Sequence, residues 1–297
     1  MAIESREFTF NVSSPAKLKL GNISGSVVVE PGEDGIIHVL AVKHPGRGDE
    51  EGTKIECVQA EDGSVSISTR FSDPGLSFLF GAQVCDVDYV VKVPRQCSLN
   101  LNGVSNSLNV SGFEGDFAFK TVSGDITIQS LTGPLNIDSV SGDITGEILS
   151  GSCQLKSVSG DINLRDSNLV SANVKTVSGD VSLQSGLLEG PYKFHTVSGD
   201  MRLLVPVTSS CNVEMHSVSG DFSTNLPVTQ STHSHGNHSA RVGTGGVDVT
   251  LNSVSGDLML ECDGEIPQAV EKNSLEILSK VESGELSVED ALVQLNR

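Results

Sequence analysis

The tetrapeptide Val-Ser-Gly-Asp occurs seven times in this chain, and its spacing limits the fold more than any other feature. Measured between the aspartates, successive copies are 18, 18, 19, 20, 21 and 36 residues apart. A period near twenty is too short for a propeller blade or a two-helix repeat, and it suits one rung of a β-solenoid. The last step is twice eighteen, and a degenerate copy, RVGTGGVDV from Arg241, lies in that gap beside a polar insert. The spacing therefore predicts an all-β fold in which the copies stack in chain order as a parallel β-helix.

Alternation within one copy predicts which side chains form the core. Val122, Gly124, Ile126 and Ile128 fall on one face of a strand, and polar residues fall between them. Each later break in the alternation is interpreted as a corner of the rung. Stacking in register at about 4.8 Å then predicts columns of similar residues. The predicted core columns are Val122, Val140, Val158, Val177, Val197, Val218 and Val254; Ile126, Ile144, Ile162, Val181, Met201, Phe222 and Leu258; and Ile137, Leu155, Val174, Phe194, Met215 and Leu251.

The glycine of each copy is predicted to have a structural function. A side chain at this position would collide where the strand bends or where a neighbouring backbone approaches closely. The predicted structural glycines are Gly124, Gly142, Gly160, Gly179, Gly199, Gly220 and Gly256.

The aspartate of each copy has two interpretations. Carboxylates one rung apart repel each other by about 1 kcal/mol in water and by about 3–4 kcal/mol at an effective dielectric of about 20. In the first interpretation, solvent, serine hydroxyls or backbone amides around the bend relieve this repulsion. In the second, the column binds cations such as Ca²⁺, although its spacing matches neither calcium-binding β-rolls nor EF-hands. The candidate cation ligands are Asp125, Asp143, Asp161, Asp180, Asp200, Asp221 and Asp257.

Histidines provide a second candidate metal site. The polar stretch TQSTHSHGNHSARVGTGG contains His233, His235 and His238, and imidazole is the commonest transition-metal ligand. A loop that holds no metal is the alternative. His195 and His216 precede successive copies at equivalent positions, in a column that also contains lysines, and this pattern predicts an exposed polar face.

Charge and composition narrow the classes of function. The chain has 38 acidic and 19 basic residues, and its net charge of −19 repels nucleic acid and anionic lipid surfaces. The N-terminal MAIESREFTF does not match a signal peptide, and no window has the length of a membrane span, so we expect a cytoplasmic protein without direct membrane insertion. The six cysteines form no Cys-x-x-Cys pair, and we expect reduced thiols in the core.

The two ends of the chain differ from the repeat region at 116–264. Residues 1–115 contain two degenerate copies, NISGSVVVE and GVSNSLNVSG, and strand-like segments that predict a β-rich N-terminal cap. Residues 267–297 predict a helical hairpin whose second helix begins with a capping box. This hairpin is too small to be stable alone, so we expect it to pack on the last rung or on another protein. The predicted docking residues of the tail are Leu275, Leu278, Val281, Leu292 and Leu295.

These motifs resemble a known family. The run of [Ser/Thr]-Val-Ser-Gly-Asp copies from Thr121 to Leu258, together with VDYVVKVP and GTGG, resembles the bacterial toastrack β-helix family of adhesin-like proteins, whose function is largely unassigned. The segment ILSKVESGELSVEDALVQL resembles the short two-helix SHOCT-type domain. The resemblance implies a right-handed β-helix without catalytic residues or a cofactor. It also implies an interaction or sensing module that works beside membrane-associated components of an envelope-stress system.

Three functions follow from these observations. A non-enzymatic scaffold or sensor that binds protein partners through its helical tail is the principal hypothesis. A self-associating filament protein or an adhesin is the alternative. A polysaccharide-active enzyme is less favoured, because the acidic residues are spread evenly, basic residues are few and Trp is absent.

Overall fold

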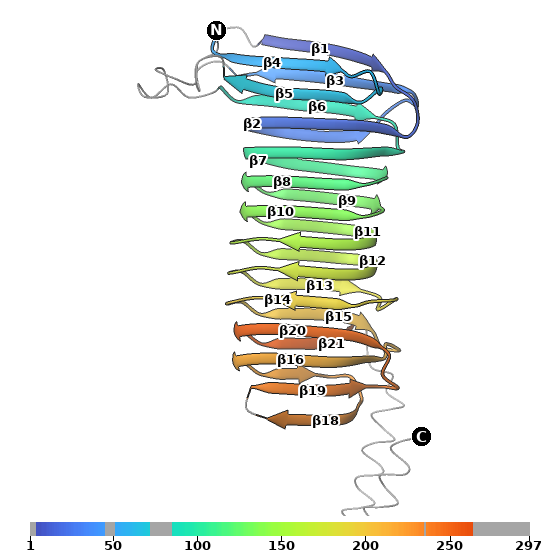
Figure 1. The fold of residues 1–297 in the computed structure, drawn as a ribbon, viewed down its shortest axis with the longest axis vertical. Coiled ribbons are helices and arrows are strands. Elements are labelled where there is room, and N and C mark those ends of the chain that lie inside the picture. The colour runs from blue at the N-terminus through green and yellow to red at the C-terminus, as the bar shows by residue number, and fades with distance from the viewer. Residues whose placement is uncertain (1–3, 45–50, 72–84, 235, 264–297) are drawn as a thin grey trace, which may run out of the picture.

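The structure, a computed structural model of the chain, describes residues 4–44, 51–71, 85–234 and 236–263. All regular elements in these ranges are β-strands, and Figure 1 shows them stacked along one long axis to form a rod. The predicted helical tail at 267–297 lies outside the described residues and remains a prediction. Within the described ranges, no helix has the length and apolar character needed to span a membrane.

The Val-Ser-Gly-Asp region forms the predicted stack of parallel strands. Segments of equal position in neighbouring rungs pair in register, so that Ile144 pairs with Ile126 on one side and with Ile162 on the other. The strands of this region are β7 (Cys97–Glu114), β8 (Phe117–Ser123), β9 (Ile126–Thr132), β10 (Leu135–Ser141), β11 (Ile144–Lys156), β12 (Ile162–Lys175), β13 (Val181–Ser185), β14 (Tyr192–His195), β15 (Met201–Pro206), β16 (Cys211–Ser219), β17 (Phe222–Thr224), β20 (Val247–Ser255) and β21 (Leu258–Asp263).

Two of the three predicted core columns are confirmed. The column from Ile137 to Leu251 is buried throughout, and the column from Ile126 to Leu258 is buried except at Phe222, which is partly buried near the end of the stack. These side chains line the interior of the rod, where stacked aliphatic residues exclude water and make each rung depend on its neighbours.

The predicted valine column is wrong, because the valines point outward. Val122 and Val158 are 48% and 47% exposed, whereas Thr121 and Ser157 immediately before them are buried. The last inward side chain of β8 is thus the threonine, and the alternation restarts after the corner at Ile126. In five rungs the buried hydroxyl donates a hydrogen bond to the carbonyl oxygen two residues on, as Thr121 Oγ1 does to Ser123 over 3.2 Å. The equivalent hydroxyls of Ser217 and Ser253 have no hydrogen-bond partner among the residues that the structure describes.

The expected chain order of the rungs is also wrong at the C-terminal end of the rod. Strand β20 pairs with β14 on one side and with β16 on the other, and β21 likewise lies between β15 and β17. The chain therefore passes over one rung position, forms β16 and β17, and later returns to fill the gap, as the colours in Figure 1 show. His195 and His216 are consequently separated by Asn252.

An antiparallel hairpin follows the parallel stack at this end. Strand β18 (Val228–Ser234) pairs with β19 (Asn237–Val242), and β19 pairs with β16. The degenerate copy expected from Arg241 is not a rung of its own, because Arg241 lies in β19 and the next residues turn into β20.

The N-terminal strands join the other end of the rod. Strand β2 is a rung that contains NISGSVVVE, and it pairs in parallel with β7 so that Ser24 lies opposite Ser105. On its other side β2 pairs with β5 and β6, and antiparallel partners complete this end. These strands are β1 (Glu4–Asn11), β2 (Ala16–Pro31), β3 (Ile36–Lys43), β4 (Thr53–Gln59), β5 (Val65–Phe71) and β6 (Val87–Val93).

Candidate functional surface at the repeat corner

The Ser-Gly-Asp of each copy forms a corner of the rung. Gly142 and Gly160 both have φ of +110°, a conformation that residues with a Cβ rarely adopt. A Cβ on Gly160 would also clash with the carbonyl oxygen of Gly142 in the preceding rung. The same close approach to a backbone carbonyl recurs at all the predicted structural glycines, Gly124, Gly142, Gly160, Gly179, Gly199, Gly220 and Gly256.

The aspartates of the corners form one continuous ladder. Asp143 accepts a hydrogen bond at Oδ1 from the backbone N–H of Asp161 over 2.9 Å, and the Oδ1 of Asp161 in turn accepts one from Asp180 over 2.9 Å. A backbone amide therefore lies beside each pair of neighbouring carboxylates and offsets their repulsion. In order along the rod, the Asp ladder comprises Asp125, Asp143, Asp161, Asp180, Asp200, Asp257 and Asp221.

The candidate metal ligands are only partly brought together. His233 and His238 face each other across the β18–β19 hairpin with their Nδ1 atoms 3.0 Å apart, while His235 lies outside the described residues. In the Asp ladder, one oxygen of each carboxylate from Asp125 to Asp257 is already engaged by an amide. Across the residues that the structure describes, no three His, Cys, Asp or Glu side chains gather as a metal-binding group.

An exposed apolar stripe runs beside the Asp ladder. Each of its residues is the last outward side chain before a corner, and all are between 46% and 82% exposed. We call this set the valine stripe. In order along the rod it comprises Val104, Val122, Val140, Val158, Val177, Val197, Val254 and Val218.

A polar column that contains three lysines lies on the other side of the valine stripe. Its residues are two positions before each valine on the same outer face, and we call it the Lys/His column. Its one acidic member, Asp138, lies between Lys120 and Lys156, with oxygen-to-Nζ distances of 3.3 and 3.6 Å. In order along the rod, the column comprises Asn102, Lys120, Asp138, Lys156, Lys175, His195, Asn252 and His216.

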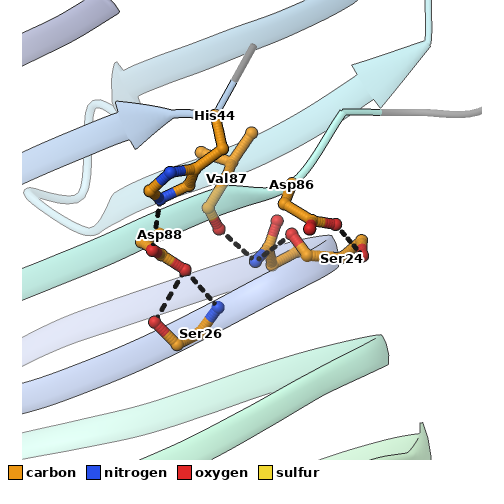
Figure 2. Close-up of polar contacts among 7 residues, drawn as sticks. Ser24, Ser26, His44, Asp86, Val87 and Asp88 are labelled. Atoms are coloured by element: carbon orange, nitrogen blue, oxygen red, sulfur yellow. Dashed lines mark hydrogen bonds and ion pairs between the residues drawn. The ribbon is translucent and has the colours of Figure 1, made fainter. Parts of the chain in front are cut away.

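Sequence reasoning missed a polar cluster that joins the N-terminal strands to the first rung (Figure 2). Asp88 on β6 accepts hydrogen bonds at Oδ1 from the backbone N–H and the hydroxyl of Ser26, both over 2.7 Å, and its Oδ2 lies 2.5 Å from His44 Nε2. Burial raises the pKa of Asp88, but the hydrogen bonds from Ser26 and His44 outweigh burial and hold that pKa below its usual value. The amide of Ser26 donates to Asp88 as the amide of each corner aspartate donates to the carboxylate of the preceding rung, so Asp88 takes the ladder position before Ser26. The degenerate copy NISGS, with serine in place of aspartate, is the sequence signal at this corner.

This cluster has the residue types of a hydrolase triad in a different arrangement. The Ser26 hydroxyl donates to the carboxylate, and the carboxylate lies between the serine and His44. In a catalytic triad the imidazole contacts the serine and takes its proton, so the cluster is arranged for structural bonding.

Five of the six cysteines are buried. Burial raises the pKa of Cys153 to about 12 and that of half-buried Cys57 to about 11. Both thiols therefore remain protonated at neutral pH, which makes them poor nucleophiles.

Stacked rungs, a glycine corner and a ladder of aspartates define a β-solenoid repeat protein. The chain belongs to the Toastrack DUF4097 family, whose model matches residues 16–261. Comparison with curated proteins found no match.

Solved structures with a similar fold have low sequence identity to this chain. A candidate adhesin from Bacteroides fragilis NCTC 9343 is 11% identical with a TM-score of 0.48, and the match covers 88% of this chain and 97% of that one. A candidate adhesin from Parabacteroides distasonis ATCC 8503 is 12% identical with a TM-score of 0.43 and the same coverage of both chains.

Proposed function

We propose that this protein is a non-enzymatic interaction scaffold whose rod presents the valine stripe to a protein partner. The exposure of the stripe carries this proposal. Its eight valines contribute nothing to the packed interior, yet every rung from β7 to β16 places one at the same outward position. Aligned apolar groups on a protein surface mark interaction sites, whereas isolated ones do not.

The surroundings of the acidic and nucleophilic groups support a binding function. The corner carboxylates are distributed along the rod and bonded to amides, and Ser26 donates to a carboxylate and not to an imidazole. Polysaccharide-active sites require acids clustered around one scissile bond, with separations of about 5–10 Å between paired carboxylates and a bound sugar between them. In the Asp ladder, by contrast, the carboxylates do not cluster at one place, and the same surroundings recur from rung to rung.

The helical tail is the second docking element of the proposal. Leu275, Leu278, Val281, Leu292 and Leu295 lie outside the described residues, and their function in partner binding comes from the sequence pattern. We propose that the tail connects the rod to a membrane-associated partner, and that the protein serves as a scaffold or sensor in a bacterial envelope-stress system.

Affinity purification from the native cell tests the scaffold function. Four baits are compared by quantitative mass spectrometry: the full chain, a chain without residues 267–297, the full chain with Val158→Asp and Val177→Asp, and the full chain with Val58→Asp. Val58 is 59% exposed on β4, away from the stripe, and provides the matched control. We expect specific partners of the full chain and the control to be lost with the tail deletion, the stripe variant, or both. Identical recovery by all four folded baits contradicts the proposal.

A further inference from the structure

We propose that the valine stripe binds a second copy of this chain, with the two rods side by side and parallel. This inference rests on the proposed function, because it names the partner of the same surface. Two properties of the surface support it, namely the spacing of the valines and the charges on either side of them.

The spacing of the stripe favours a second copy over an unrelated partner. Neighbouring valines are one rung apart, and their flanking residues pair in register, as Thr121 does with Ser139 and Ser123 with Ser141. Eight valines at about 4.8 Å per step extend over about 34 Å. A partner must present apolar groups at the same repeat over this length to cover all of them, and a second rod has that repeat by identity.

The flanking charges select the relative direction of the two rods. A two-fold axis parallel to the rods exchanges left and right, so the Lys/His column of one copy faces the Asp ladder of the other. Each rung then lies opposite the same rung of the second copy, with Lys120 opposite Asp125, Lys156 opposite Asp161 and Lys175 opposite Asp180. Asp138 would face Asp143 in this arrangement, with Lys120 and Lys156 beside it. A two-fold axis perpendicular to the rods would instead place lysines on the same side as lysines and the two Asp ladders opposite each other.

Local complementarity matters because the whole chain is strongly acidic. The net charge of −19 opposes approach of two copies, so an interface needs cations at the point of contact. The Lys/His column provides three lysines beside the valine stripe. Its one aspartate, Asp138, is already paired with Lys120 and Lys156. Exposed ion pairs of this kind determine orientation more than affinity.

The size of the surface predicts a reversible dimer. A strip about 34 Å long and about 13 Å wide covers about 450 Å² per copy, which is below the roughly 800 Å² per partner of stable complexes. The dimer should therefore dissociate on dilution, with a dissociation constant in the micromolar range or weaker.

Sedimentation velocity of the full chain over a concentration series tests the interface. We expect a monomer–dimer equilibrium that Val158→Asp with Val177→Asp weakens at least tenfold, because four carboxylates would then be enclosed in each dimer. Lys156→Glu with Lys175→Glu should also weaken it, and the Val58→Asp control should not. Circular dichroism confirms that each variant is folded. A monomer at all concentrations up to about 1 mM, or a dimer that the stripe variant leaves unchanged, overturns the proposal.

Disulfide trapping tests the direction. Val140→Cys and Val197→Cys lie at different heights on the rod, and in a parallel dimer each meets its own equivalent in the second copy. Each single variant should therefore form a covalent dimer on mild oxidation, while the parent chain should not. An antiparallel dimer centred on the stripe would cross-link only in a mixture of the two variants, and this result would overturn the parallel arrangement.

The outcomes separate this inference from the function on which it rests. If the stripe variant no longer captures a partner other than this chain in the affinity experiment, and the full chain is monomeric, the scaffold function is supported and the proposed self-association is wrong. If the full chain dimerises through the stripe and captures nothing else, self-association is the scaffold function itself.

Discussion

The glycine meets two demands at six of the seven corners, a positive φ and the close approach of a backbone carbonyl, whereas Gly220 meets only the second. At Gly160 the backbone has φ of +110°, and the carbonyl oxygen of Gly142 occupies the place of a Cβ. Because φ is positive, any other residue at this position would be strained. Because the carbonyl oxygen lies where a Cβ would be, a side chain could be accommodated only if the two rungs moved apart. Because the rungs share one core, such a separation affects more than the substituted residue.

Gly160→Ala should destabilise the protein by about 3 kcal/mol or more, since strain and a backbone clash combine. Gly21→Ala is the matched control, because Gly21 is also in a rung but a Cβ there would meet no atom within 4 Å and its φ is not positive. The control should change stability by less than about 1 kcal/mol. Chemical denaturation measures both values, and equal effects at the two positions would contradict the clash.

Asp161 tests whether the ladder depends on charge or on a hydrogen-bond acceptor. Asp161→Ala removes the acceptor for the Asp180 amide and should cost about 1 kcal/mol. Asp161→Asn retains an Oδ1 acceptor and removes one charge from a column of like charges, so its stability should stay within about 0.5 kcal/mol of the parent. Thermal unfolding distinguishes the two variants, and an equal loss in both would show that the negative charge itself is required.

The valines show where sequence periodicity fails at the residue scale. The alternation that identified Ile126 and Ile137 as core is correct within each strand, and the sequence sufficed for these columns. The prediction fails because the same alternation does not continue across the corner, where the glycine conformation interrupts the period of two. Thr121 is therefore buried and Val122 exposed, although valine is the more hydrophobic of the two residues. The sequence thus correctly grouped the valines as one column. It wrongly assigned this column to the core, whereas the valines form the exposed surface that we propose for binding.

Among the elements, β7 shows how a degenerate rung keeps its place in the stack. In GVSNS, Asn106 stands at the usual glycine position and Gly103 at the position of the buried hydroxyl. The Asn106 side chain is 2% exposed and fills the space that a side chain on residue 103 would need. The two substitutions therefore compensate each other within one rung.

The contact of β6 with β2 should make stability depend on pH through Asp88. Hydrogen bonds lower the pKa of Asp88 in the folded state, so the carboxylate is more favourable there than in the unfolded chain. Its contribution is present above the usual aspartate pKa of about 3.9 and is lost as pH falls through the lower folded value. Asp88→Asn should cost about 1 kcal/mol at neutral pH, a modest value because the side chain is 35% exposed.

Urea unfolding of the parent and of Asp88→Asn at several pH values measures this linkage. The difference in unfolding free energy should shrink as the pH is lowered below about 4. Asp34→Asn, at an exposed position between β2 and β3, is the control and should show no comparable trend. A difference that is constant with pH would mean that the Asp88 charge is not the source of the stability.

At the scale of the whole molecule, the repeat predicts that rungs stack but leaves their order open. Strands β14, β20 and β16 are aligned in the same register, and β16 and β20 have similar inward side chains. Either strand could therefore pair with β14. Between β17 and β20 the chain runs through the β18–β19 hairpin, whose polar sequence contains no copy of the motif. Chain order was the simplest assumption, and the return of the chain through this hairpin could not be inferred from the spacing of 36 residues.

The order of the rungs predicts different effects for two buried residues. Leu251 is fully buried and lies between Phe194 on β14 and Met215 on β16. Leu251→Ala should cost about 2–5 kcal/mol and should increase hydrogen exchange in both neighbouring strands.

Met215→Ala provides the comparison, because Met215 pairs with Leu251 and His238 but not with residues of β14. It should increase exchange in β16 and β20 while β14 stays protected, since in a solenoid each rung directly supports only its neighbours. Hydrogen exchange followed by mass spectrometry resolves these segments in the full chain. Rungs stacked in chain order would give the reverse pattern, with β14 sensitive to Met215→Ala and insensitive to Leu251→Ala.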